Sequence, residues 1–135
     1  MRNAIRVFSF LLLTAPLTGC LTGGVRPAAV APLPSGAAAL GGGLVGQTAA
    51  GKALKSDARS RAVLAEYQAL QFGAAGVPVA WSTGSQSGEV VPTQLYRVGS
   101  QDCRGYSHAI DTGKGQSREL GTACRTADGN WKTVG

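Results

Sequence analysis

The sequence predicts an α+β fold with an extended N-terminal segment, one amphipathic helix and a small antiparallel β-sheet. Two changes of pattern along the 135 residues indicate this fold. An apolar repeat of helical period occupies residues 56–72, and from residue 77 onward short runs with a period of two replace it. The chain after residue 20 is long enough for one small domain and a tail.

The first 20 residues have the pattern of an export signal. Arg2 and Arg6 precede an uncharged, mostly apolar stretch over residues 7–18, which is too short for a membrane-spanning helix. The stretch that follows, "LTGC", resembles the lipobox of bacterial lipoproteins and ends at Cys20. This resemblance implies a signal peptide over residues 1–19 and a covalent lipid on Cys20, an S-diacylglycerol and an N-acyl chain such as palmitate. Leu21, in place of an aspartate, favours the outer membrane. The alternative is an ordinary cleaved signal with Cys20 as a plain thiol.

Two segments of low complexity follow the lipobox. Residues 20–35 are rich in Pro, Gly and Ala without an apolar period, which predicts a flexible, lipidated tether. Residues 36–55 form a glycine-rich, glycine-zipper-like segment, in which small residues recur every four positions: Ala38, Gly42, Gly46 and Ala50. On a helix they would line one face, through which copies of the chain could associate. A disordered linker is the alternative, because glycine destabilises helices in water.

The helix is predicted over residues 56–72. Ser56 is a candidate N-cap, Asp57 lies in the first turn and Gly73 ends the helix. The apolar stripe consists of Val63, Tyr67 and Leu70, and the polar positions are Arg59, Arg61, Glu66 and Gln68. We expect the stripe to pack on the domain that follows.

Residues 77–135 predict an antiparallel module of four to six strands. The apolar runs are 77–81, 88–92, 93–98, 103–110, 118–125 and 130–134. Arg104, Tyr106, His108 and Ile110 share one face of their strand. Asp128 and Gly129 suit a tight hairpin turn, and the sheet together with the helix should bury both tryptophans.

Two cysteines lie in this module. In an oxidising compartment Cys103 and Cys124 can form a disulfide that closes a loop of roughly 20 residues, which contributes about 3 kcal/mol to stability. A metal site is the alternative, but His108 alone supplies too few further ligands. We therefore expect neither a metal nor a cofactor.

Several motifs of this module resemble the 17 kDa surface-antigen family of Gram-negative outer-membrane lipoproteins. The matching residues are Trp81, Gly88, Val90, Pro92, Tyr96, Cys103, Arg104, Tyr106, Gly121 to Arg125, Asp128, Gly129 and Trp131. The family pairs a lipobox and glycine-zipper segments with this module, and often carries two such segments where this chain has one. The resemblance implies an outer-membrane, surface-immunogenic lipoprotein and brings no molecular activity with it.

Charge narrows the range of partners. The formal net charge is +6, and it is +4 without Arg2 and Arg6. Basic residues ahead of the module are suited to bind anionic headgroups or lipopolysaccharide. They are Arg26, Lys52, Lys55, Arg59 and Arg61. A basic face that only contacts solvent explains this cluster of charge equally well. Nucleic acid is excluded as a partner by export and by the absence of a binding motif.

The sequence contains no constellation typical of catalysis. His108 is adjacent to Ser107, but neighbouring strand residues point to opposite faces, so we expect no enzyme. A contact for an anion or a glycan could form from Arg104, Tyr106, Arg125 and Trp131. The alternative is that both arginines pack on aromatic rings of the core.

Together these features predict an outer-membrane lipoprotein, lipid-anchored and facing the periplasm or the cell surface, with a structural or interaction role in the envelope. Its partners would be outer-membrane lipid, lipopolysaccharide, peptidoglycan or envelope proteins. The alternative is a periplasmic inhibitor or regulator of a cell-wall hydrolase, which presents the loop 111–116 with Lys114 at its tip.

Overall fold

The computed structural model describes residues 32–135. The predicted signal peptide, the lipidation site Cys20 and the tether up to residue 31 lie outside the described residues. The described elements are α1 (Ser35–Ala39), α2 (Gly43–Gln47), α3 (Ala49–Lys52), α4 (Ser56–Phe72), β1 (Val79–Thr83), β2 (Gln86–Val98), β3 (Gln101–Asp111), β4 (Gln116–Arg125) and β5 (Trp131–Val134). The α+β class is confirmed.

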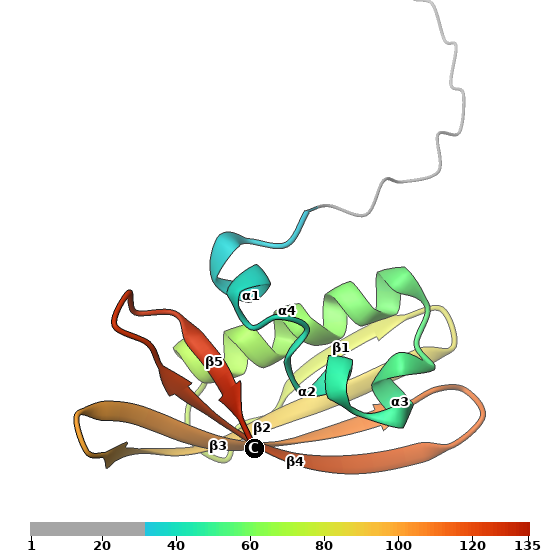
Figure 1. The fold of residues 1–135 in the computed structure, drawn as a ribbon. Coiled ribbons are helices and arrows are strands. Elements are labelled where there is room, and N and C mark those ends of the chain that lie inside the picture. Colours follow the sequence, from blue (N-terminus) through green and yellow to red (C-terminus); the bar gives the residue numbers. More distant parts are fainter. Residues whose placement is uncertain (1–31) are drawn as a thin grey trace, which may run out of the picture.

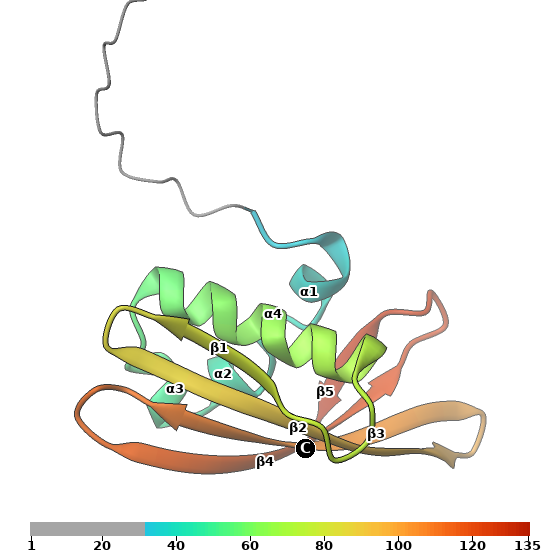
Figure 2. The same ribbon diagram turned by 180° about the vertical axis from the view of Figure 1, so that it is seen from behind.

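The five strands form one antiparallel meander in the order β1-β2-β3-β4-β5. The helices lie together on one face of this sheet, and no described helix covers the other face (Figures 1 and 2). The runs 88–92 and 93–98, predicted as separate strands, join into the single strand β2. A bulge between Pro92 and Leu95 keeps the chain extended where proline cannot donate to the ladder.

Helix α4 has the predicted bounds. Lys55, rather than Ser56, is the residue that precedes the first helical turn, and Gly73 ends the helix by donating its N–H to the carbonyls of Gln68 and Ala69. Val63 and Leu70 are buried as expected. Glu66 was assigned to the polar face, and this was wrong, because its side chain is fully buried beneath the helix.

The glycine-rich segment is neither one continuous helix nor a linker. Gly41, Gly42 and the first residue of α2, Gly43, have positive φ values of 62°, 91° and 58° and turn the chain between α1 and α2. Extended Thr48 separates α2 from α3. The predicted row of small residues does not lie along one helix, because Ala38 is in α1, Gly46 is in α2 and Ala50 is in α3. Instead the segment inserts its larger side chains into the core: Leu40, Leu44, Val45 and Leu54.

One hydrophobic core joins the short helices, α4 and the sheet. The strands contribute Trp81, Val90, Tyr106, Ile110, Ala123 and Trp131. Both tryptophans are buried, as predicted. The disulfide is also confirmed: Cys103 and Cys124 are register partners on β3 and β4 and are bonded through their sulfurs.

Candidate functional site

Arg104 on β3 is buried beneath the C-terminal end of α4. Its Nη1 donates to the carbonyl oxygens of Ala69 and Leu70, each at 3.0 Å, and its Nη2 donates to that of Gly73 at 2.6 Å. Its Nε donates to the carbonyl oxygen of Thr93 on β2 at 2.7 Å. The last carbonyls of a helix have no N–H ahead of them to accept from, so Arg104 caps α4. Burial lowers the pKa of the Arg104 guanidinium.

Arg125 lies against Trp131 at the junction of β4 and β5. Its guanidinium carbon is 4.7 Å from the centre of the indole ring, and its Nη2 donates to Gln71 Oε1 at 3.2 Å. The indole N–H of Trp131 donates to the same Gln71 oxygen at 3.0 Å. Gln71 in the last turn of α4 thereby ties the cation–π pair to the helix.

The predicted anion or glycan contact of Arg104, Tyr106, Arg125 and Trp131 stays a prediction. The structure brings all four residues to the helix-covered face, but it gives the Arg104 guanidinium four carbonyl partners and leaves Tyr106 only 2 % exposed. Arg125 on Trp131 matches the alternative, in which the arginines pack on the rings of the core. The geometry therefore favours a role of these arginines in holding α4 to the sheet.

A buried carboxylate is the polar centre of the core. Glu66 on α4 is fully buried, and its Oε2 and Oε1 accept the backbone N–H groups of Leu44 and Val45 at 2.9 and 3.1 Å. His108 Nδ1 lies 2.8 Å from Oε1, and the Tyr106 hydroxyl lies 3.5 Å from Oε2. Glu66 thus satisfies the N-terminal donors of α2 while it pairs with β3.

The partners of His108 fix its protonation. Its Nε2 lies 2.8 Å from the indole Nε1 of Trp81, which can only donate a hydrogen bond. Nε2 must therefore be the acceptor and Nδ1 must carry the ring proton, which it donates to Glu66. The geometry assigns a neutral imidazole to His108.

Two neighbours complete this cluster. Burial, and then the adjacent Glu66 carboxylate, raise the pKa of the Tyr106 hydroxyl, which stays neutral. Gly43 has φ 58°, and a Cβ at this position would clash with Glu66 Oε2, so only glycine allows the carboxylate to approach α2. The sequence analysis missed Glu66 as a core residue. Its spacing from Val63 and Leu70 could have identified it, because it lies three residues after one and four before the other.

His108 and Ser107, which are neighbours in the sequence, make hydrogen bonds on opposite faces of β3. Both ring nitrogens of His108 have partners inside the core, and the hydroxyl of Ser107 accepts from Arg118 on the other face. Across residues 32–135 no group of three or more His, Cys, Asp or Glu side chains lies close enough together to hold a metal ion. In the same residues no helix has the length and apolar character needed to cross a membrane.

The predicted loop 111–116 is a hairpin tip with its own hydrogen bonds. Asp111 accepts from the backbone N–H of Gly113 at 2.8 Å and from the side-chain amide of Gln116 at 3.0 Å, and Thr112 bonds to the carbonyl of Gly115. These bonds lower the pKa of Asp111, the Gln116 bond most strongly. Lys114 is exposed at the tip.

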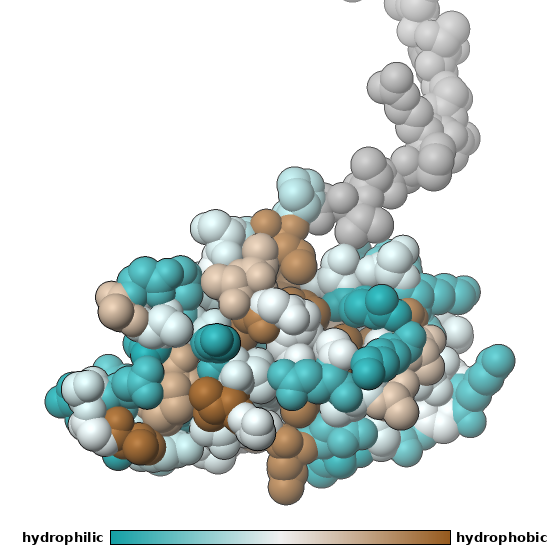
Figure 3. All heavy atoms as spheres, viewed as in Figure 1, coloured by the Kyte–Doolittle hydropathy of each residue, from teal (hydrophilic) through white to brown (hydrophobic). Residues whose placement is uncertain are grey.

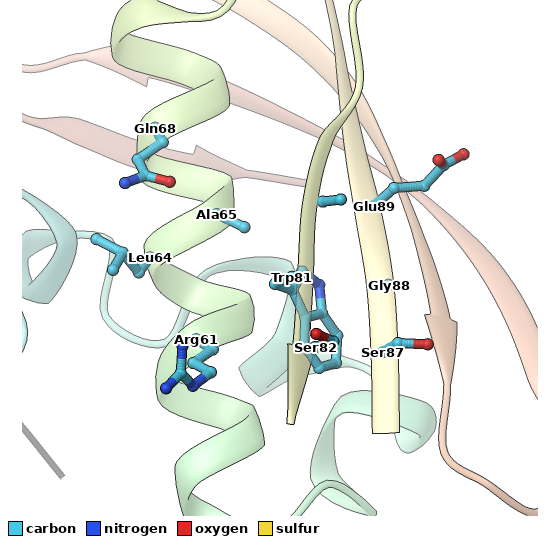
Figure 4. A pocket seen from close by; sticks show the side chains of 10 residues that line it. Arg61, Leu64, Ala65, Gln68, Trp81, Ser82, Ser87, Gly88 and Glu89 are labelled. Carbon is cyan, nitrogen blue, oxygen red and sulfur yellow. The ribbon is translucent and has the colours of Figure 1, made fainter. Parts of the chain in front are cut away.

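A surface cleft of about 780 Å³ lies between α4 and the edge of the sheet. In Figure 4, α4 forms one side and the strands β1 and β2 form the other. The lining residues are Arg61, Leu64, Ala65, Gln68, Ala80, Trp81, Ser82, Ser87, Gly88 and Glu89. On the face shown in Figure 3, hydrophobic side chains form small separate groups among hydrophilic ones.

Known proteins with detectable similarity are surface antigens. The 17 kDa surface antigen of Rickettsia bellii is 33 % identical over 87 residues, which are 62 % of this chain and 55 % of that protein. The protein of the same name from Rickettsia conorii is 35 % identical over 79 residues, which cover 56 % of this chain and 50 % of the relative. The chain thus spans about half the length of the curated relatives it matches. No family model matches the chain. No solved structure matches it either.

These similarities confirm the resemblance found in the sequence. The relatives from Rickettsia bellii and Rickettsia conorii share one name, and their identities to this chain are 33 % and 35 %. Over 62 % of its length the chain is similar to the 17 kDa surface antigen of Rickettsia bellii.

Proposed function

We propose that the protein is a non-catalytic lipoprotein of the outer membrane, anchored through acylated Cys20, whose folded module has a structural or interaction role in the envelope. The name of the relatives supports a place in the envelope. The lipobox-like residues 17–20 support the anchor. Lipid, lipopolysaccharide and peptidoglycan are the envelope components within reach of a module tethered in this way.

One observation carries the non-catalytic part of the proposal. Among the described residues, the buried charged side chains Glu66 and Arg104 form hydrogen bonds with backbone groups and with other residues of the core. His108, the single histidine of the chain, lies between Glu66 and Trp81. A catalytic base needs a free lone pair that faces a substrate, and His108 has none.

The anchor is tested by fractionating Gram-negative cells that express the full chain or its Cys20→Ser variant, followed by intact-mass measurement. The proposal expects the wild-type protein in the outer-membrane fraction, with a mature N-terminus at Cys20 and the added mass of acyl chains. The Cys20→Ser variant should lose the acyl mass. A Thr22→Ser variant is the control and should behave as wild type. A wild-type protein without lipid in the soluble periplasm would overturn the anchor.

A second candidate function is inhibition or regulation of a cell-wall hydrolase. The hydrogen-bonded loop 111–116 favours it, because a preordered hairpin tip that exposes Lys114 loses little entropy on binding an enzyme cleft. The test measures peptidoglycan hydrolysis by a purified envelope hydrolase with wild-type protein, with Lys114→Ala and with the control Lys132→Ala. Inhibition that only Lys114→Ala abolishes supports this function, and absence of inhibition by wild type removes it.

A further inference from the structure

The edge strand β1 offers unpaired main-chain groups to the cleft beside α4. A loop of two residues, Gly84 and Ser85, joins β1 to β2, and Thr83 pairs with Gln86 across it. In such a hairpin the pair that flanks the loop is hydrogen-bonded, and hydrogen-bonded pairs alternate with non-bonded pairs. The N–H and C=O groups of Ala80 and Ser82 therefore point away from β2.

These groups remain open in the described part of the chain. Ala80 and Ser82 are both exposed, and no hydrogen bond from a loop, a helix or a side chain reaches their backbone. Both residues line the cleft of about 780 Å³. The cleft therefore lies where an additional strand would pair with the sheet.

The walls of the cleft are suited to a peptide. Leu64 is half-buried and provides apolar surface for a side chain of an added strand, while Trp81 forms the largely buried floor of the cleft. Figure 4 shows Arg61 and Gln68 along the α4 side of the same cleft. Glu89 also lines it, but its carboxylate pairs with Arg118 at 3.8 Å. Within residues 32–135, Arg61 has no ion pair, so its guanidinium can pair with a carboxylate of a bound peptide.

We propose that this cleft binds an extended segment of a partner protein, which adds to the edge of β1 as a sixth strand and places a carboxylate near Arg61. Main-chain groups repeating every second residue match the backbone of an extended peptide, and Arg61 complements an acidic side chain or a C-terminal carboxylate. β1 has only five residues, which limits the added strand to a short segment. The inference specifies the partner of the proposed interaction role and rests on that role, but it does not depend on the lipid anchor.

The probe is a phage-displayed library of random nonapeptides selected on the purified full chain in detergent, with the selected peptide resynthesised for affinity measurement. We expect extended, β-branched sequences that carry Asp or Glu. Ser82→Pro removes the outward N–H while it leaves the bonds to β2, and should weaken binding at least about tenfold. Arg61→Glu should weaken it severalfold. The controls Ser82→Ala and Lys132→Glu should stay within about twofold.

A second readout identifies the site if Ser82→Pro is unstable. Hydrogen exchange of the wild-type protein should show that the peptide newly protects the amides of Ala80 and Ser82. Failure to select any peptide, or equal affinity for folded Ser82→Pro, overturns the proposal. Self-association of wild type that Ser82→Pro abolishes also overturns it, because a second copy then occupies the edge. Loss of lipid in the fractionation experiment would leave this result unaffected, so the two failures are distinguishable.

Discussion

Glu66 joins three elements of the fold through its own hydrogen bonds. It extends from α4, accepts two N–H groups of α2, and reaches β3 through Tyr106 and His108. His108 continues the chain of hydrogen bonds to Trp81 on β1. A buried carboxylate is favourable only when it is fully bonded, so these partners depend on one another.

Glu66→Gln should lower the free energy of unfolding by about 3 kcal/mol. The amide keeps the shape of the carboxylate, but its NH₂ group must face either the Leu44 N–H or the Val45 N–H, which are both donors. Denaturant unfolding of the purified full chain measures the loss. Glu119→Gln is the matched control, because the side chain of Glu119 makes no hydrogen bond or ion pair with a described residue, and it should change stability by less than about 0.5 kcal/mol.

Arg104→Lys should lower the free energy of unfolding, measured by denaturant unfolding, by about 2 kcal/mol although it preserves the charge. An ammonium group cannot reach the carbonyls of Ala69, Leu70 and Gly73 together, because it lacks the planar fork of the guanidinium. Arg97→Lys is the control, since Arg97 makes only an exposed pair with Asp102. Equal stability of the two variants would show that Arg104 does not cap α4.

At the scale of elements, Asp57 and Thr83 join the start of α4 to the end of β1. The Thr83 hydroxyl donates to Asp57 Oδ2 at 2.8 Å and is the largest cause that lowers the pKa of Asp57 below 3.8. A carboxyl group whose pKa is lowered by folding stabilises the fold above its unfolded pKa, and this contribution disappears as the pH falls through the folded value.

Thr83→Val should therefore destabilise the protein at pH 7 and have progressively less effect below about pH 4. Unfolding midpoints of wild type and variant, measured between pH 7 and pH 2, test this convergence. The pKa values of Asp111 and Asp128 are also lowered by hydrogen bonds, but both proteins share these groups, so the difference isolates Asp57. A pH-independent difference would contradict the linkage. Asp57→Asn, introduced into wild type and into Thr83→Val, should remove the pH dependence of the difference between them.

The disulfide acts between β3 and β4. It links positions 21 residues apart, and a loop of this size gives a stabilisation of about 3 kcal/mol in the chain-entropy model. The double variant Cys103→Ala, Cys124→Ala should lose this amount, and reductant should destabilise wild type but not the variant. Unfolding with and without a thiol reductant measures both effects. Sensitivity of the variant to reductant would mean that the effect does not come from this bond.

At the scale of the whole molecule, the parts predicted from sequence are those with a repeating pattern. The bounds of α4 follow from its apolar spacing and Gly73, and the strands follow from alternation and turn residues. The segment 36–55 was not predictable in this way. Its four-residue spacing suggested one helix, whereas consecutive positive-φ glycines let it fold back over Glu66. The conformation of this segment depends on its tertiary contact with Glu66, and a tertiary contact cannot be predicted from the spacing of small residues.

Glu66 shows the same limit for the candidate site. Its spacing from Val63 and Leu70 indicates that it faces the core, but its hydrogen-bond partners at residues 44, 45, 106 and 108 could not be predicted from that spacing. The predicted grouping of Arg104 with Tyr106 on one strand face was confirmed. The end of α4 at Gly73 was predictable, but its position over β3, which brings its carbonyls to Arg104, depends on tertiary packing and was not.

The buried side chains of Glu66, Arg104 and His108 hold the helices and the sheet together through their hydrogen bonds. The nitrogen NMR signals of the single histidine test this central claim most directly, because His108 contacts α4 and β1 at once. The account predicts a neutral imidazole with its proton on Nδ1 and an acceptor Nε2, and it predicts that Trp81→Phe and Glu66→Gln both alter the signals. A protonated Nε2, or a ring that exchanges its proton with solvent as an exposed histidine does, would contradict it.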